Sequence, residues 1–246
     1  MKKSYVKMFF VVMLCMAIGH TQAQGLKGAL NKAKGAVNNV TNKNGTTKAD
    51  EKSQNKTAKP LAPEVKNAVS EIRSLTGLTQ AEFDKKAKSM GYTKATDGTG
   101  LYGGGTIYKS KTNTISLRMG TRGGNELSYE ITKYIYNKKP NLATMKVNFL
   151  NLGKQCTDLK AEFEYANIEE SGKILGGVRA KNVANRNSKF LPALDNLINA
   201  KKDFLATDEY TEEDYTYKIN FYFTNIDGSA MVQLTVADNT IDSMEG

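Results

Sequence analysis

The sequence predicts an α+β protein in which helices pack on one face of an antiparallel sheet of about five strands. Three observations support this prediction. Apolar residues recur at helical spacing in some stretches, they alternate at strand spacing in others, and tight turns separate the alternating stretches. Hydrophobic residues make up 39% of the 246 residues and charged residues 24%, which is typical of a chain that mostly folds into a globule.

The first 23 residues have the pattern of an export signal. A basic start precedes an apolar run and a small-x-small end, in the order Lys2, Lys3, Lys7, Met8–Ile18 and Thr21-x-Ala23. The apolar run is too short to span a bilayer, which requires about 20 residues in a helix. We therefore expect residues 1–23 to be a signal peptide and the mature chain to begin at Gln24, in the periplasm or outside the cell. An uncleaved anchor and a lipoprotein signal at Cys15 are the alternatives.

The positive charge of the chain lies mostly outside the part that is expected to fold. The formal net charge of +10 invites a nucleic-acid-binding interpretation. Of this charge, +3 belongs to residues 1–23 and +6 to residues 24–63, so residues 64–246 carry only +1. We therefore expect no nucleic-acid partner for the folded part.

Residues 24–40 and 41–63 precede the folded part and differ in pattern. Apolar residues at steps of four and three predict a basic amphipathic helix over 24–40, through Leu26, Leu30, Ala33, Val37 and Val40. Because a helix of about 16 residues is marginal alone in water, weak contact with a membrane surface through residues 25–40, docking on the globule and partial disorder are the alternatives. Residues 41–63 are mostly polar and contain no aromatic side chain, which predicts a flexible linker.

Residues 64–140 predict a first pass of two helices and a β-meander. A helical stripe runs from Val65 to Leu75. The next helix has capping-box spacing, with Thr79 three residues before Glu82, and Gly91 stands where a C-terminal glycine is typical. Alternating apolar residues between Gly-rich turns then predict short strands at 106–109, 115–119 and 127–135.

Residues 141–238 predict a second pass of two helices and a hairpin. Helical spacing from Leu142 to Ala166 predicts one long helix, in which Gly153 is unfavourable by about 1 kcal/mol relative to Ala. The alternative is a strand at 145–149 followed by a shorter helix. A loop at 169–186, a helix at 190–205 and strands at 215–223 and 230–236 follow, and residues 239–246 are expected to fray.

This order of helix pairs and antiparallel strands resembles the tandem modules of beta-lactamase-inhibitor-like proteins and of outer-membrane-assembly lipoproteins. The resemblance implies a fold in which helix pairs lie on antiparallel sheets. It concerns the order of elements alone, and it transfers no functional residue.

The sequence lacks the common catalytic and cofactor motifs. The one histidine, His20, falls in the export signal, which removes the imidazole that Ser-His-Asp and Cys-His hydrolases and His-ligated zinc need. Gly103–Gly105 does not open a helix, and Gly153-Lys154 is not followed by Ser or Thr, so neither has the pattern of a phosphate-binding loop. Cys156 lies on an apolar helical stripe and is expected to be buried. We therefore expect no cofactor.

Two groups of carboxylates are candidates for chemistry. A weak candidate for calcium comprises Asp208, Glu209, Glu212, Glu213 and Asp214. Their spacing lacks the alternate-residue carboxylates and the central Gly of an EF-hand, which favours a solvated acidic loop. The second group comprises Glu162, Glu164, Glu169 and Glu170, which could supply the acid and the base of a carboxylate-dependent hydrolase.

The least ordinary feature of the sequence is the position of three tyrosines on the predicted strands. Tyr134, Tyr136 and Tyr222 lie off the apolar alternation of their strands, as do amphipathic contact residues in interfaces. Lys133 lies on the apolar face of its strand, where a charge is unexpected. The alternatives are that it stands at a strand end, that it extends its amine to solvent and that it lines a pocket. The favoured hypothesis is an exported, non-enzymatic binding protein of the cell envelope, whose partner is a protein or another envelope component. A small-molecule or lipid binder with a pocket between sheet and helices is the second hypothesis, and the hydrolase is the third.

Overall fold

The computed structural model describes residues 65–95, 105–137, 140–170 and 177–243, all within one compact unit that spans Lys59–Gly246. The segments 1–23, 24–40 and 41–63 lie outside the described residues, so the structure does not test the signal peptide, the basic helix or the linker.

The strands form one antiparallel sheet, as the sequence predicts, but the sheet is larger than predicted. Nine strands take part instead of about five. Eight lie in the order β1-β2-β3-β4-β8-β7-β6-β5, and β9 pairs with β3. Their bounds are β1 Thr93–Lys94, β2 Thr106–Lys109, β3 Asn113–Arg122, β4 Asn125–Asn137, β5 Glu162–Glu170, β6 Phe204–Thr211, β7 Tyr215–Phe223, β8 Ala230–Asp238 and β9 Asp242–Ser243.

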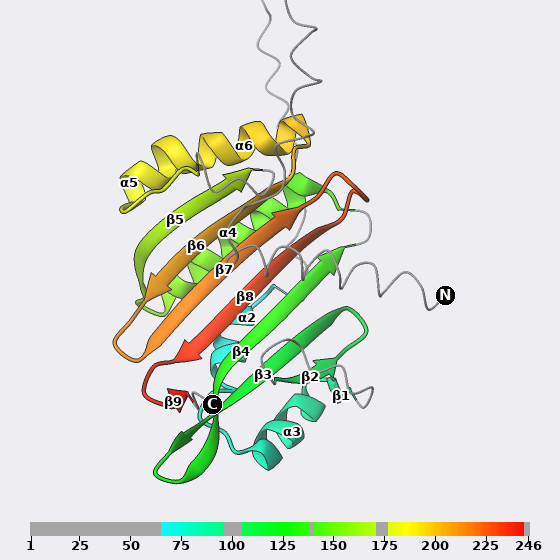
Figure 1. Ribbon diagram of the computed structural model, residues 1–246, viewed down its shortest axis with the longest axis vertical. Helices are drawn as coiled ribbons and strands as arrows, with labels where there is room; N and C mark the ends of the chain where they lie inside the picture. The colour runs from blue at the N-terminus through cyan, green and yellow to red at the C-terminus, as the bar shows by residue number, and fades with distance from the viewer. Residues whose placement is uncertain (1–64, 96–104, 138–139, 171–176, 244–246) are drawn as a thin grey trace, which may run out of the picture. The chain divides into compact units, whose positions relative to one another are not determined.

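The helices α2 and α4 pack on one face of this sheet, and α6 lies beside its edge strand β5. The bounds of the described helices are α2 Ala68–Arg73, α3 Gln80–Ser89, α4 Leu142–Asp158, α5 Val183–Asn185, the π-helical turn η2 Arg186–Phe190, and α6 Leu191–Ala200. α4 packs on β5 to β8, and α2 packs on β4, β8 and α4. Figure 1 shows α2 and α4 behind the sheet, so that its other face is turned toward the viewer.

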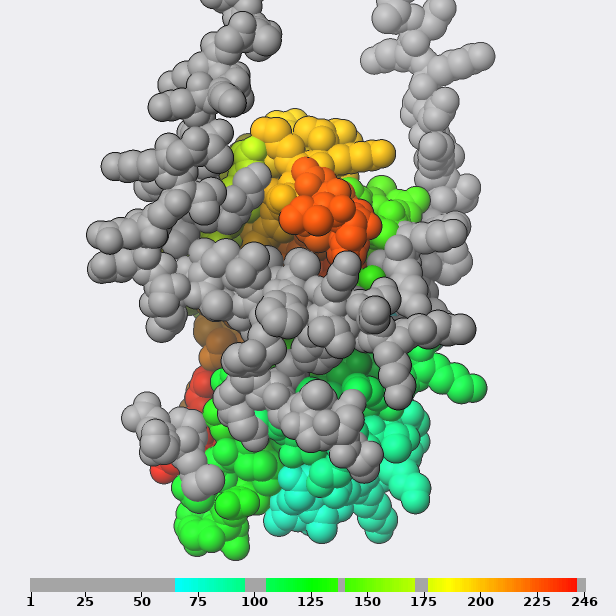
Figure 2. Space-filling model, turned by 45° about the vertical axis from the view of Figure 1, so that its right-hand side comes forward, coloured from blue at the N-terminus to red at the C-terminus, as the bar shows by residue number. Residues whose placement is uncertain are grey.

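The two predicted halves share the sheet. Residues 64–140 contribute β1 to β4 and residues 141–238 contribute β5 to β8, and eight residue pairs between β4 and β8 join them. At one end the tip of the β3–β4 hairpin lies near α3, and at the other end α6 lies near the β7–β8 turn (Figure 2). The second half departs from the predicted order because β5 separates α4 from the next helices.

The predicted long helix over 142–166 is wrong beyond Asp158. Lys160 adopts a left-handed backbone with φ 74°, and the chain then enters β5. A β-bulge between Phe163 and Tyr165 shifts the register of β5 against β6. The bulge turns Phe163 and Ala166 to the same face of the strand, and their spacing of three residues therefore imitates a helix.

Other segments also differ from prediction. The predicted loop at 169–186 begins inside β5 and ends in α5 and η2. The predicted helix at 190–205 ends at Ala200, and Leu205 belongs to β6. The predicted fraying at 239–246 is wrong for its first residues, because Ile241 is buried and β9 pairs with β3.

The core lies between the sheet and the helices and is filled by apolar side chains. Phe149 of α4 lies 6.1 Å from Phe221 of β7 and 6.3 Å from Phe190, measured between ring centroids. Phe204 of β6 meets Phe221 edge to face at 4.9 Å. These rings hold α4 and η2 against the second half of the sheet, because aromatic pairs at such distances add to the stabilisation from burial.

Candidate functional site: the open face of the sheet

The face of the sheet opposite α2 and α4 is called the open face. Strand pairing arranges its side chains in rows that cross β3, β4, β8, β7, β6 and β5. The amide row comprises Thr114, Tyr134, Gln233, Asn220, Thr207 and Asn167. The aromatic row lies only on β4, β8, β7 and β6 and comprises Tyr136, Met231, Tyr222 and Leu205. The charged row comprises Ser116, Thr132, Thr235, Lys218, Glu209 and Tyr165.

The structure brings the three predicted contact tyrosines to this one face. Tyr134 belongs to the amide row, while Tyr136 and Tyr222 flank Met231 in the aromatic row. All three tyrosines are partly buried. Burial raises the pKa of Tyr134, and a hydrogen bond with Ser116 opposes this rise.

The fourth predicted contact residue, Lys133, lies on the other face. Its side chain is 2% exposed in the middle of β4, and its Nζ lies 3.1 Å from the Oε2 of Glu71 on α2. Lys133 therefore neither marks a strand end nor extends its amine to solvent. It anchors α2 to the sheet through an ion pair in which the ammonium group is buried and the Glu71 side chain is 34% exposed, since a buried ammonium group needs a partner.

The amide row contains an unsatisfied polar atom. Thr207 Oγ1 donates a hydrogen bond of 2.8 Å to Asn220 Oδ1. Gln233 Nε2 lies 3.4 Å from Thr235 Oγ1, whereas Gln233 Oε1 is buried and has no partner. Asn220 is 5% and Gln233 is 8% exposed. Most buried polar atoms in folded proteins have a partner, so this atom requires an explanation.

The aromatic row offers an apolar contact beside the amide row. Met231 lies between Tyr136 and Tyr222 in the register of β4, β8 and β7 and is 6% exposed. Leu205 follows Tyr222 on β6 and is partly buried. Met and Tyr side chains are enriched at the centres of protein interfaces.

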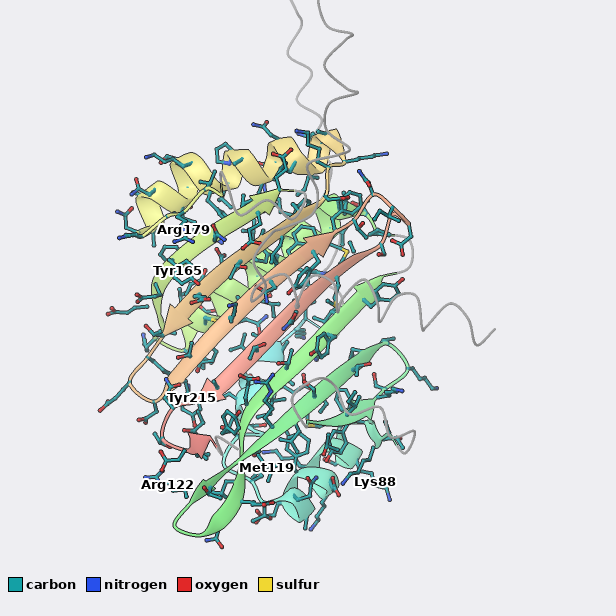
Figure 3. The ribbon with its side chains drawn as sticks, viewed as in Figure 1. Lys88, Met119, Arg122, Tyr165, Arg179 and Tyr215 are labelled. Atoms are coloured by element: carbon teal, nitrogen blue, oxygen red, sulfur yellow. The ribbon has the colours of Figure 1, made fainter. Side chains whose placement is uncertain are left out.

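The charged row pairs its own charges. Glu209 accepts a 2.8 Å hydrogen bond from the hydroxyl of Tyr165, and its carboxylate lies 3.1 Å from Lys218 Nζ. Burial and this hydrogen bond raise the pKa of Tyr165 to about 12. Figure 3 shows Tyr165 and Arg179 close together beside β5. The charges of this row thus neutralise each other, which leaves the adjacent amide row without a net charge.

The structure disperses the acidic group that was a weak calcium candidate. Asp208 lies in β6, where both of its carboxylate oxygens are 3.1 Å from Arg186 Nε. Burial raises the pKa of Asp208, and the Arg186 guanidinium opposes this rise. Glu209 belongs to the open face, and Glu212 pairs with Arg73 at 2.8 Å.

The last two carboxylates of that group, Glu213 and Asp214, are exposed between β6 and β7. Among the described residues, no group of three or more His, Cys, Asp or Glu side chains could hold a metal ion.

The carboxylates proposed for a hydrolase all lie on β5 and are spread along it. Glu169 lies on the open face and accepts a hydrogen bond from Asn167 Nδ2 at 3.2 Å. Glu170 points to the opposite face, and its carboxylate lies 2.6 Å from Lys202 Nζ. Glu162 and Glu164 stand near the other end of the strand. At about 3.3 Å per residue, Glu162 and Glu169 are roughly 23 Å apart along β5.

Cys156 is fully buried in α4, which confirms the expectation from its helical stripe. Burial raises the pKa of its thiol, and the Asp208 carboxylate raises it further. A thiol in such surroundings is a poor nucleophile, because the thiolate is the reactive form.

Comparison with known proteins adds no identity. No protein family, no curated protein and no solved structure matches the chain. None of the helices in the described part of the chain is long and apolar enough to cross a membrane.

Sequence reasoning found the tyrosines of the open face but not the amide row. Asn220 and Gln233 alternate with apolar residues, as solvated positions of any half-buried strand do. Only the pairing of β7 with β8 shows that they are direct neighbours.

Proposed function

We propose that this protein is an exported, non-enzymatic binding protein of the cell envelope that contacts a protein or another envelope component through the open face. The observation that carries the proposal is the position of Tyr134, Tyr136 and Tyr222 on one face of the sheet while α2 and α4 pack on the other. Tyrosines at such a face combine apolar contact with hydrogen bonding.

The chemistry of the described residues supports a role without catalysis. Cys156 is buried, and Asp208, Glu209 and Glu212 are engaged by Arg186, Lys218 and Arg73. A catalyst needs an acid, a base, a nucleophile or a metal in working geometry. The carboxylates of β5 are spread along one strand and do not converge.

Export rests on the pattern of residues 1–23. Mass spectrometry of the protein from its native host is expected to find a mature chain that begins at Gln24. A mature chain that still begins at Met1 would contradict export by cleavage, and one that begins at a lipidated Cys15 would replace it.

The contact role is tested by a pull-down from the native envelope fraction. A variant with Tyr134→Ser, Tyr136→Ser and Tyr222→Ser is expected to lose its partner while keeping its circular dichroism spectrum. The corresponding triple Tyr→Phe variant keeps the rings and should retain most of the binding. A matched control on the helical side carries Lys88→Ser, Lys160→Ser and Lys189→Ser, all at exposed positions. Equal recovery by the folded Tyr→Ser variant would exclude this surface.

A further inference from the structure

The unsatisfied amide of Gln233 indicates a binding position at the centre of the open face. Gln233 is nine-tenths buried on β8, and its Oε1 has no partner. An exchange of the two amide atoms would not remove the defect, because the other atom would then lack a partner. A buried polar atom without a hydrogen bond is destabilising, and a ligand that donates a hydrogen bond to it would remove this cost.

The residue opposite Gln233 has the complementary group. Asn220 pairs directly with Gln233 in the register of β7 and β8, which places their Cβ atoms about 5 Å apart. The Oδ1 of Asn220 accepts from Thr207, and its Nδ2 forms no hydrogen bond with a described residue. An acceptor at Gln233 and a donor at Asn220 therefore stand side by side.

This pair matches the backbone of an extended polypeptide. In an extended chain the N–H and the C=O of one residue point to the same side, as in a hydrogen-bonded pair of antiparallel strands. The N–H would donate to Gln233 Oε1, and the C=O would accept from Asn220 Nδ2. A neighbouring apolar side chain of the same ligand would contact Met231, two residues from Gln233 on β8.

Two further features favour an uncharged peptide segment at this point. The nearest charges in the adjacent row, Lys218 and Glu209, neutralise each other at 3.1 Å. Met231 and Leu205 provide apolar contacts, which suit aliphatic side chains better than sugar hydroxyls.

We infer that the open face binds an extended, uncharged polypeptide segment whose backbone forms hydrogen bonds with Gln233 and Asn220 and whose apolar side chain contacts Met231. This inference rests on the proposed function and names the chemistry of the partner. Because Gln233 is nine-tenths buried, a ligand can reach its side chain only if neighbouring side chains move.

The test selects ligands with the full chain and then measures variants. The immobilised protein is panned against a phage library of random linear 12-residue peptides, and chito- and cello-oligosaccharides are tested in parallel. Dissociation constants of enriched peptides are then measured for the wild type, for Gln233→Met and for a control, Thr216→Val. Thr216 lies on β7 four residues before Asn220 and is not part of the amide row.

The expected result separates a binding role from a structural one. Gln233→Met removes the unsatisfied atom at similar volume, so the midpoint of thermal unfolding should stay equal or rise. Peptide affinity should fall about five- to tenfold, the effect of one or two hydrogen bonds. Thr216→Val should leave affinity unchanged.

Each other outcome overturns a defined part of the inference. Equal affinity for wild type and Gln233→Met would overturn the amide contact while leaving the tyrosine surface in place. Enrichment of no peptide would overturn the polypeptide class, as would Gln233-dependent binding of an oligosaccharide instead. Loss of stability in Gln233→Met without loss of affinity would assign Gln233 a structural role. The proposed function itself would fail only if the triple Tyr→Ser variant also kept its partner.

Discussion

The substitution Gly153→Ala tests how closely α4 approaches the sheet. Gly153 is buried within α4, and a Cβ added there would overlap the hydroxyl oxygen of Tyr210 on β6 and lie 3.1 Å from its Cζ. The added Cβ cannot be accommodated unless Tyr210 or α4 moves, and Tyr210 has little room to move because it is only 4% exposed. Glycine is therefore required here by a close approach, although it is unfavourable inside a helix.

Two opposing effects decide the magnitude. Alanine is favoured over glycine in a helix interior by about 1 kcal/mol. Inserting a methyl group into a packed core costs about 1–3 kcal/mol. We expect the packing cost to exceed the gain in helix propensity, because the added methyl group meets a ring that is held in the core. The free energy of unfolding should therefore fall by about 1 kcal/mol.

The assay is urea unfolding of a double-mutant cycle with Tyr210→Phe. Removing the hydroxyl eliminates the overlap with the added Cβ and leaves its contacts with the ring at 3.1 and 3.4 Å. Gly153→Ala should therefore be neutral or stabilising in the Tyr210→Phe background, with a coupling energy of about 1 kcal/mol. Val147→Ala, at an exposed position of α4, controls for helix propensity. A Gly153→Ala protein that is more stable than the wild type, or a coupling within error of zero, would refute the reasoning.

Three further predictions concern buried and capping groups. Cys156 should resist a thiol reagent such as Ellman's reagent at pH 8 in the native protein and react on unfolding in urea, because burial raises its pKa; fast labelling of the native state would contradict this. Glu71→Ala should destabilise the protein by roughly 1–3 kcal/mol in urea unfolding, since it leaves the buried Lys133 unpaired. Lys133→Met removes the buried charge itself and should change stability little. Equal effects of the two substitutions would contradict the ion-pair account. Hydrogen bonds from the backbone and side chain of Thr79 lower the pKa of Glu82 in the folded protein. The Glu82 carboxylate therefore stabilises the protein above the unfolded-state pKa near 4.5, and this stabilisation is lost as the pH falls through the lower pKa of the folded state. Glu82→Gln should therefore flatten the pH dependence of stability in that window, and an unchanged slope would contradict this cause.

The sequence predicts the local elements of this fold well where short-range signals are strong. The capping box of α3 forms as expected, with the Thr79 side chain accepting from Glu82 N and the Glu82 carboxylate accepting from Thr79 N at 3.0 Å. The final hairpin also forms, with β7 and β8 flanking the turn that contains Gly228. In both cases the information lies within a few residues of the element.

The strands that the sequence conceals owe their form to distant contacts. In β5 the bulge gives Phe163 and Ala166 helical spacing. In β6 the charged Asp208 occupies the core face, where its partner Arg186 comes from η2, so the apolar alternation of the strand is interrupted. Neither effect can be deduced before the tertiary partner is known.

The same limit applies to the candidate site. Alternation along β4 and β7 places the three tyrosines correctly on one face, since it depends only on residues within each strand. The juxtaposition of Gln233 and Asn220 depends on the register between β7 and β8, and the burial of Lys133 depends on Glu71 of α2.

Site-specific photo-crosslinking in the native envelope tests the central claim most directly. A benzophenone amino acid replaces Tyr134 on the open face, and in a separate protein it replaces the exposed Val147 on the helical side. The account predicts that position 134 yields one predominant crosslinked product and that position 147 yields none. The additional substitutions Tyr136→Ser and Tyr222→Ser should weaken the product from position 134. A defined product from position 147 with none from position 134 would contradict the assignment of the open face as the contact surface.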